Sequence, residues 1–151
     1  HIKYFHSSRY IDDLANGDVC IAMGYSGDVF QARDAAVEAE NGIEIEYIIP
    51  KEGAVRWVDL MAIPADAPHA DNAHAFINHL LRPEVAAGIV DYVSYASPNT
   101  AALPLVDPEI AADPGVYPPA DVMAKLVDPV TLPQETTRER VRAWTSIKTG
   151  Q

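Results

Sequence analysis

The chain has 151 residues, 48% of them hydrophobic, which is enough for one domain of ordinary size with its own core. Its 22 Asp and Glu residues against 11 Lys and Arg residues give a formal net charge of -11. That charge repels nucleic acid and anionic lipid, and it favours cationic partners or simple solubility. No apolar run approaches the length of a membrane span.

The sequence begins at a histidine, with neither a methionine nor a signal peptide. From this we expect a piece cut from a longer chain or a processed product.

A short helix is predicted at residues 9–15, directly after a pair of serines that would cap it. Tyr10, Ile11 and Leu14 recur at helical spacing, so they would form the buried face of this helix.

A buried strand is predicted at residues 19–24, and a longer helix at residues 28–40. Cys20 lies in the middle of the strand and would be a small core residue or, in an exported protein, the partner of a cysteine outside this segment. The turn at residues 24–28 (GYSGD) joins the two elements. A strand that opens directly into a helix places such a turn at the carboxyl end of a sheet, where α/β folds bind ligands.

The rest of the chain continues to alternate between strand and helix patterns, which indicates an α/β fold. Strands are predicted at 43–49 and 54–63, helices at 70–81, 84–90, 119–126 and 133–148, an extended piece at 92–95 and a weak helical turn at 108–112.

Several kinds of chemistry find no support in the residues. His69, His74 and His79 are spaced by five, so on a helix they point in different directions and cannot converge on one metal ion. No serine lies in a G-x-S-x-G turn, and no glycine-rich phosphate loop occurs. We therefore predict no catalytic residue, metal site or cofactor.

Aromatic and acidic residues occur together at the ends of the predicted strands. Tyr25 accompanies Asp28, Trp57 accompanies Asp59 on one strand face, and Tyr95 is at the end of the extended piece. A ring face attracts a cation and a carboxylate neutralises it, so two such pairs would suit a slender dication.

Structural explanations of the same residues stay open at this point. Ser26 would cap the helix that follows the turn, and Asp28 would complement its dipole. Trp57 would belong to the core, and Asp59 would pair with Arg56 or a backbone amide.

Five motifs resemble the polyamine-binding periplasmic proteins, the putrescine- and spermidine-binding subunits of ABC importers. They are residues 16–28 (NGDVCIAMGYSGD), 49–54 (IPKEGA), 57–59 (WVD), 80–83 (LLRP) and 116–121 (VYPPAD). The likeness runs from about Lys3 to the end of the chain and is closest to the putrescine-type branch.

The resemblance implies the C-terminal portion of a two-lobed α/β periplasmic binding protein of type II, the "Venus flytrap" fold. Residues 1–42 would belong to the second lobe. Residues 43–99 would supply a crossing strand and part of the first lobe, and residues 100–151 would return to the second lobe with the C-terminal helices.

The resemblance also implies the ligand contacts. Asp28 and Asp59 would hold the ammonium groups of a polyamine, while Tyr25, Trp57 and Tyr95 would form the aromatic wall. Tyr25 stands where the family often has tryptophan, and Trp57 where it often has phenylalanine, so the choice between putrescine and spermidine stays open.

The implied role is solute binding in the periplasm without enzymatic activity. The partners would be the polyamine, the missing N-terminal portion of the same protein and an ABC transporter permease, with no nucleic acid. The alternatives are the ligand-sensing domain of a regulator or chemoreceptor, and a hydrolase that uses Asp28 and Asp59.

Overall fold

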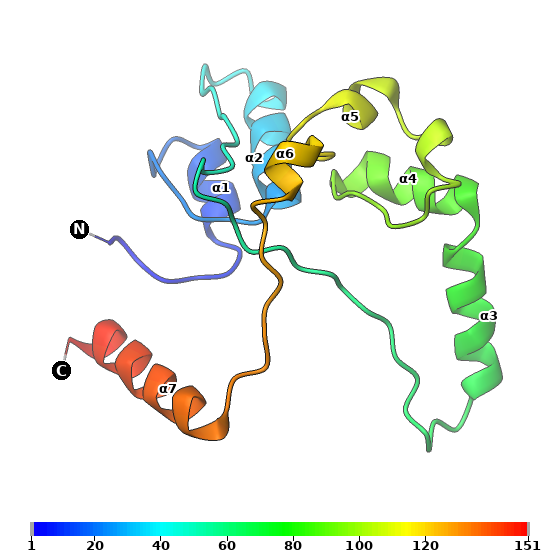
Figure 1. Cartoon of the computed structure of the whole chain (residues 1–151). Helices are drawn as coiled ribbons and strands as arrows, with labels where there is room; N and C mark the ends of the chain where they lie inside the picture. Colours follow the sequence, from blue (N-terminus) through cyan, green and yellow to red (C-terminus); the bar gives the residue numbers. More distant parts are fainter. Residues whose placement is uncertain (1, 151) are drawn as a thin grey trace.

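A computed structural model describes residues 2–150, and within them all regular structure is helical (Figure 1). The elements are α1 (Tyr10–Ala15), α2 (Ser26–Glu38), α3 (Ala70–Leu80), α4 (Pro83–Val93), the 3-10 turn η1 (Leu103–Leu105), α5 (Pro108–Ala112), α6 (Ala120–Met123) and α7 (Gln134–Thr149).

Most of the helices lie where the sequence predicts them. Helices α2, α3 and α7 begin and end within two residues of their predicted bounds, and the weak helical turn at residues 108–112 is α5. Two helices differ in length: α6 covers only Ala120–Met123 of the predicted 119–126, and α4 continues through the predicted extended piece as far as Val93. It ends at Ser94, whose left-handed backbone (φ 54) cannot continue a helix.

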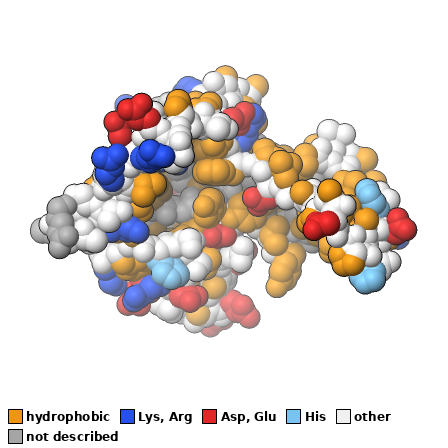
Figure 2. All heavy atoms as spheres, turned by 90° about the horizontal axis from the view of Figure 1, so that it is seen from below, with side chains coloured by type: hydrophobic (Ala, Val, Ile, Leu, Met, Phe, Trp, Pro, Cys, Tyr) orange, Lys and Arg blue, Asp and Glu red, His pale blue; other side chains and the backbone are white. Residues whose placement is uncertain are grey.

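The three predicted strands do not form among the described residues. Ile21 and Met23 of the first are 91% and 98% exposed, and Cys20 is exposed, so its predicted burial is wrong. A strand needs the backbone groups of a neighbouring strand, and the described residues offer only one isolated bridge, between Val55 and Val127. Apolar side chains consequently lie on the surface (Figure 2).

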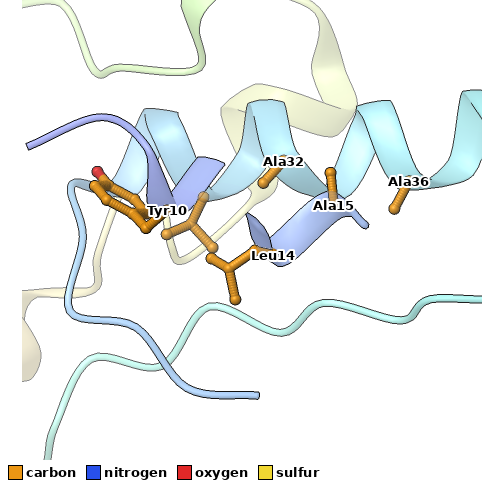
Figure 3. Close-up of a cluster of buried hydrophobic side chains, with 6 residues drawn as sticks. Tyr10, Leu14, Ala15, Ala32 and Ala36 are labelled. Atoms are coloured by element: carbon orange, nitrogen blue, oxygen red, sulfur yellow. The ribbon is translucent and has the colours of Figure 1, made fainter. Parts of the chain in front are cut away.

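The first core cluster joins α1 to α2. Tyr10, Leu14 and Ala15 of α1 pack against Val29, Ala32 and Ala36 of α2 (Figure 3). Alanine at the facing positions lets the two helices approach closely. Alternate residues of the next segment, namely Ile43, Ile45 and Tyr47, cover this cluster, so the predicted alternation holds although no strand forms.

The second core cluster lies around α4. Ala86, Ala87 and Val90 are buried against Ala102 and Val106, which stand on either side of η1. The proline-rich traverse after residue 102 is therefore held to α4 by apolar packing rather than by regular secondary structure.

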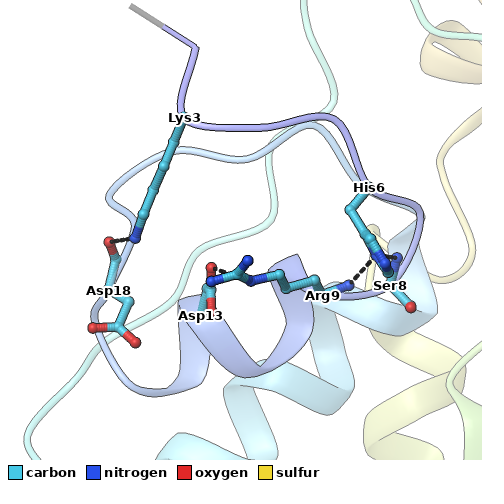
Figure 4. Close-up of polar contacts among 6 residues, drawn as sticks. All are labelled: Lys3, His6, Ser8, Arg9, Asp13 and Asp18. Atoms are coloured by element: carbon cyan, nitrogen blue, oxygen red, sulfur yellow. Dashed lines mark hydrogen bonds and ion pairs between the residues drawn. The ribbon is translucent and has the colours of Figure 1, made fainter.

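The start of α1 is not capped by serine, contrary to the prediction. The cap position is Arg9, which makes no side-chain capping bond. The backbone N–H groups of Ser8 and Arg9 instead donate to Nδ1 of His6, at 3.2 and 3.0 Å (Figure 4). Arg9 also pairs with Asp13, one helical turn along, at 3.4 Å.

Two extended segments far apart in the sequence lie side by side. The N–H of Arg56 donates to the carbonyl of Val127 at 2.9 Å, and the N–H of Val127 donates to the carbonyl of Ala54 at 3.0 Å. The Arg56 guanidinium also binds both oxygens of Asp128, at 2.8 and 2.7 Å. Figure 1 shows the first segment leading to α3 and the second to α7, so the bridge ties together the paths to two distant helices.

None of the helices in residues 2–150 is long and apolar enough to cross a lipid bilayer.

Gly53→Ala tests the close approach of these two segments. Gly53 has φ +111°, and a Cβ there would lie 2.2 Å from the carbonyl oxygen of Lys125. We expect the free energy of unfolding to fall by roughly 1–3 kcal/mol, measured by thermal denaturation. Gly42→Ala is the matched control, because Gly42 also has a positive φ (+76°) but open space around it. Equal losses in the two variants would contradict the close contact.

Candidate functional site

The candidate site is built on the turn that begins α2. Tyr25 has an extended backbone (φ -79, ψ 147) and occupies the cap position without a side-chain capping bond. The helix begins at Ser26, so the predicted serine cap is wrong here too. Asp28 lies in the first turn, where the helix dipole favours a negative charge.

Two tyrosine hydroxyl groups hold the Asp28 carboxylate. Tyr10 on α1 donates to Oδ2 at 2.6 Å, and Tyr95, just beyond α4, donates to Oδ1 at 2.8 Å. No lysine, arginine or histidine of the described residues forms an ion pair with Asp28. The carboxylate is therefore held in place by neutral donors, and its charge is not balanced by a neighbouring cation.

Tyr10 was expected only as a core residue, but its hydroxyl has a polar role. The residue is 4% exposed, and its oxygen also accepts the backbone N–H of Tyr25 at 3.0 Å. A buried tyrosine usually finds a partner for its hydroxyl, and this was the one signal in the sequence that could have pointed to it. Spacing could not identify that partner, which lies 18 residues away.

The two glycines of the turn make room for the two tyrosine rings. A Cβ at Gly24 would lie 2.4 Å from Cε2 of Tyr10, and a Cβ at Gly27 would lie 2.3 Å from Cε2 of Tyr95. Real Cβ atoms do not come so close to ring carbons. The glycine spacing of the GYSGD turn thus allows both hydroxyls to reach one carboxylate.

The environment keeps both tyrosines protonated. Burial, followed by the hydrogen bond to Asp28 as the second-largest cause, raises the pKa of the Tyr10 hydroxyl well above its usual range. The same two causes in the same order raise the pKa of Tyr95. Both phenols therefore remain hydrogen-bond donors into the alkaline range, where a free tyrosine ionises.

The structure brings together only some of the predicted site residues. Tyr25, Asp28 and Tyr95 form one group around Tyr10, and the Tyr25 side chain is half exposed. Trp57 is 62% exposed, and Asp59 is exposed beside it. Within residues 2–150, no hydrogen bond, ion pair or ring contact joins Trp57 or Asp59 to this group.

The structural alternatives for Trp57 and Asp59 are both wrong. Trp57 does not belong to the core, and Arg56 binds Asp128 rather than Asp59. No polar partner of the Asp59 side chain is found in the part of the chain that the structure describes.

Elsewhere in residues 2–150 no second site of this kind is found. His69, His74 and His79 are exposed, and the described residues contain no cluster of three metal-binding side chains. A shallow hollow lies between the N-terminal segment and α7, lined by Ile2, Lys3, Tyr4, Phe5, Ile147 and Lys148. It includes none of the predicted ligand residues.

Asp28→Asn tests the two tyrosine contacts by alkaline titration. The folded-state pKa of Tyr10 and Tyr95 lies above the unfolded value of about 10, so this stabilisation is complete below that pH and is lost as the pH rises through the folded value. Removing the carboxylate charge should let both residues ionise at lower pH, as followed by NMR of tyrosines labelled at Cζ. Tyr47, whose pKa is raised by burial alone, is the internal control. Unchanged titration of Tyr10 and Tyr95 would contradict the contacts.

Comparison with known proteins identifies the family. The sequence pattern described as bacterial extracellular solute-binding protein matches residues 2–118. The chain is 53% identical over 151 residues to the putrescine-binding periplasmic protein PotF of Escherichia coli. It is 50% identical over 151 residues to the putrescine-binding periplasmic protein SpuD of Pseudomonas aeruginosa.

A more distant relative is the spermidine/putrescine-binding periplasmic protein of Salmonella typhimurium, 37% identical over 125 residues, which are 83% of this chain and 34% of that protein. The matches to PotF and SpuD cover 100% of this chain but 41% of each relative. The chain thus spans about two fifths of the length of these curated relatives. The match over most of its residues shows that the chain belongs to the bacterial extracellular solute-binding protein family.

Proposed function

We propose that this protein is the solute-binding subunit of a polyamine importer, and that it captures a putrescine-like diamine in the periplasm. The observation that carries the proposal is the Asp28 carboxylate, which two tyrosine hydroxyls fix and which pairs with no cation among residues 2–150. The half-exposed Tyr25 belongs to the same turn. An ammonium group supplies the missing charge, and the aromatic face attracts it further. The names of the relatives, which include putrescine, support the same class of ligand.

The energetics require more than an exposed ion pair. A solvent-exposed carboxylate and ammonium contribute only about 0–1 kcal/mol, whereas micromolar capture needs about 8 kcal/mol. Partial dehydration strengthens the pair, and each ring that contacts the cation adds roughly 0.5–2 kcal/mol. Asp28 is already partly buried, and the Tyr10 hydroxyl that holds it also binds the backbone of Tyr25, so the turn provides the beginning of such a site.

The second ammonium group is assigned to Asp59, with Trp57 and Tyr95 completing the aromatic wall. Asp59 has no polar partner among the described residues, which leaves its charge available to a ligand. A diamine that is gripped at both ends requires the two acids to face one cleft, and the closing of two lobes would bring them there.

We assign residues 1–42 and 100–151 to one lobe of a type II binding protein, and residues 43–99 to a crossing strand and the other lobe. The hydrogen bond from Tyr95 to Asp28 joins residues 43–99 to residues 1–42, as expected for a site at the boundary between the two lobes. The missing N-terminal portion would supply the remaining ligand contacts and the strands that pair with the exposed extended segments. An ABC permease would recognise the closed form.

Ligand binding without a chemical reaction is favoured over the enzyme and regulator classes. The matched relatives are named as binding proteins, not as enzymes or regulators. A hydrolase would convert its substrate, whereas a binding protein returns its ligand unaltered, and mass spectrometry of the released molecule separates the two.

Asp28→Asn and Asp59→Asn test the proposal in the full-length protein. Each should weaken putrescine binding by at least about tenfold in isothermal calorimetry, because each removes the charge that meets one ammonium group. Asp12→Asn is the control, since it makes the same change in net charge at an exposed acid of α1. Unchanged affinity in both site variants would remove the pocket assignment.

A further inference from the structure

We propose that Tyr10 is a positioning residue of the polyamine site, acting through Asp28 and Tyr25 without touching the ligand. The inference rests on the proposed function and concerns a residue outside the predicted aromatic wall. One hydroxyl group connects the acid that is expected to bind the ammonium with the backbone of Tyr25, a residue of the proposed aromatic wall.

The connection follows from two hydrogen bonds that run in opposite directions. The Tyr10 hydroxyl donates its proton to Oδ2 of Asp28 at 2.6 Å, and its oxygen accepts the N–H of Tyr25 at 3.0 Å. A hydroxyl has one proton to donate, so accepting from Tyr25 leaves Asp28 as the receiver of that proton. The same atom therefore fixes the carboxylate and the cap position of α2.

Tyr10 is itself held rigidly. Its ring is buried in the cluster between α1 and α2, and the absence of a side chain at Gly24 leaves just enough room for it. A side chain locked in this way can hold a carboxylate in one orientation, which reduces the ordering cost when a ligand binds.

Burial separates the role of Tyr10 from that of Tyr95. Tyr95 is only half-buried, so it can hold Asp28 and still reach a ligand. Tyr10 is 4% exposed, so its effect on binding has to pass through the groups that it orients.

The test is a double-mutant cycle on the full-length protein with putrescine as the probe, measured by calorimetry. Tyr10→Phe should weaken binding about tenfold in the otherwise unchanged protein, because it removes a hydrogen bond to a charged group. In the Asp28→Asn background the same substitution should change affinity less than about twofold, because the oriented charge is already absent. Tyr117→Phe is the matched control: that hydroxyl also accepts a backbone N–H, from Ser97 at 3.4 Å, but no hydrogen bond within residues 2–150 joins it to a carboxylate.

A second pair of variants covers the case in which Tyr10→Phe does not fold. Gly24→Ala pushes against the Tyr10 ring and should displace its hydroxyl without removing it, so putrescine affinity should fall. Gly88→Ala in α4, where a Cβ meets nothing within 4 Å, should leave it unchanged.

The outcomes distinguish a failure of the proposed function from a failure of the positioning role of Tyr10. If the unchanged protein does not bind putrescine, the proposed function fails. If it binds and Tyr10→Phe has the same affinity for putrescine as Tyr117→Phe, only the positioning role fails. The positioning role also fails if Tyr10→Phe lowers affinity by the same factor with and without Asp28→Asn, because a merely structural effect would not depend on Asp28.

Discussion

The site depends on one carboxylate held between two neutral hydroxyl groups. Tyr10 and Tyr95 reach Asp28 from different parts of the chain and bind one oxygen each. Had an arginine taken their place, it would have neutralised the charge of the carboxylate. Because the donors are uncharged and remain protonated, the acid is ordered without an ion pair, as our proposal of an ammonium ligand requires.

The packing around Asp28 explains why this arrangement is available. Alanines bring α1 and α2 close together, which carries the Tyr10 hydroxyl to the first turn of α2. Glycines at positions 24 and 27 leave room for the rings of Tyr10 and Tyr95. Small residues thus determine which way the large polar side chains can point. The close approach of the backbones allows both tyrosine hydroxyls to reach the Asp28 carboxylate.

The extended segments find no partner strands in the described part of the chain. Residues 19–24 and 54–63 have the composition of strands, yet their apolar side chains are largely exposed. Backbone groups in a strand are satisfied only by a neighbour, and the single bridge between Val55 and Val127 is not enough to form a sheet. The relatives are more than twice as long as the matched region, in agreement with our proposal that the partner strands lie in the remainder of the protein.

The sequence by itself determined the helices, because their periodicity, prolines and terminal glycines act within a few residues of one another. It also singled out Tyr25 and Asp28, which are neighbours in one turn, and it carried the motifs of the family. Only the tertiary structure decided that Tyr10 and Tyr95, 18 and 67 residues from Asp28, would meet on its carboxylate. It alone decided that Arg56 would bind Asp128, 72 residues away, and that Cys20 would be exposed. These outcomes depend on how close distant segments come, and local propensity does not encode that distance.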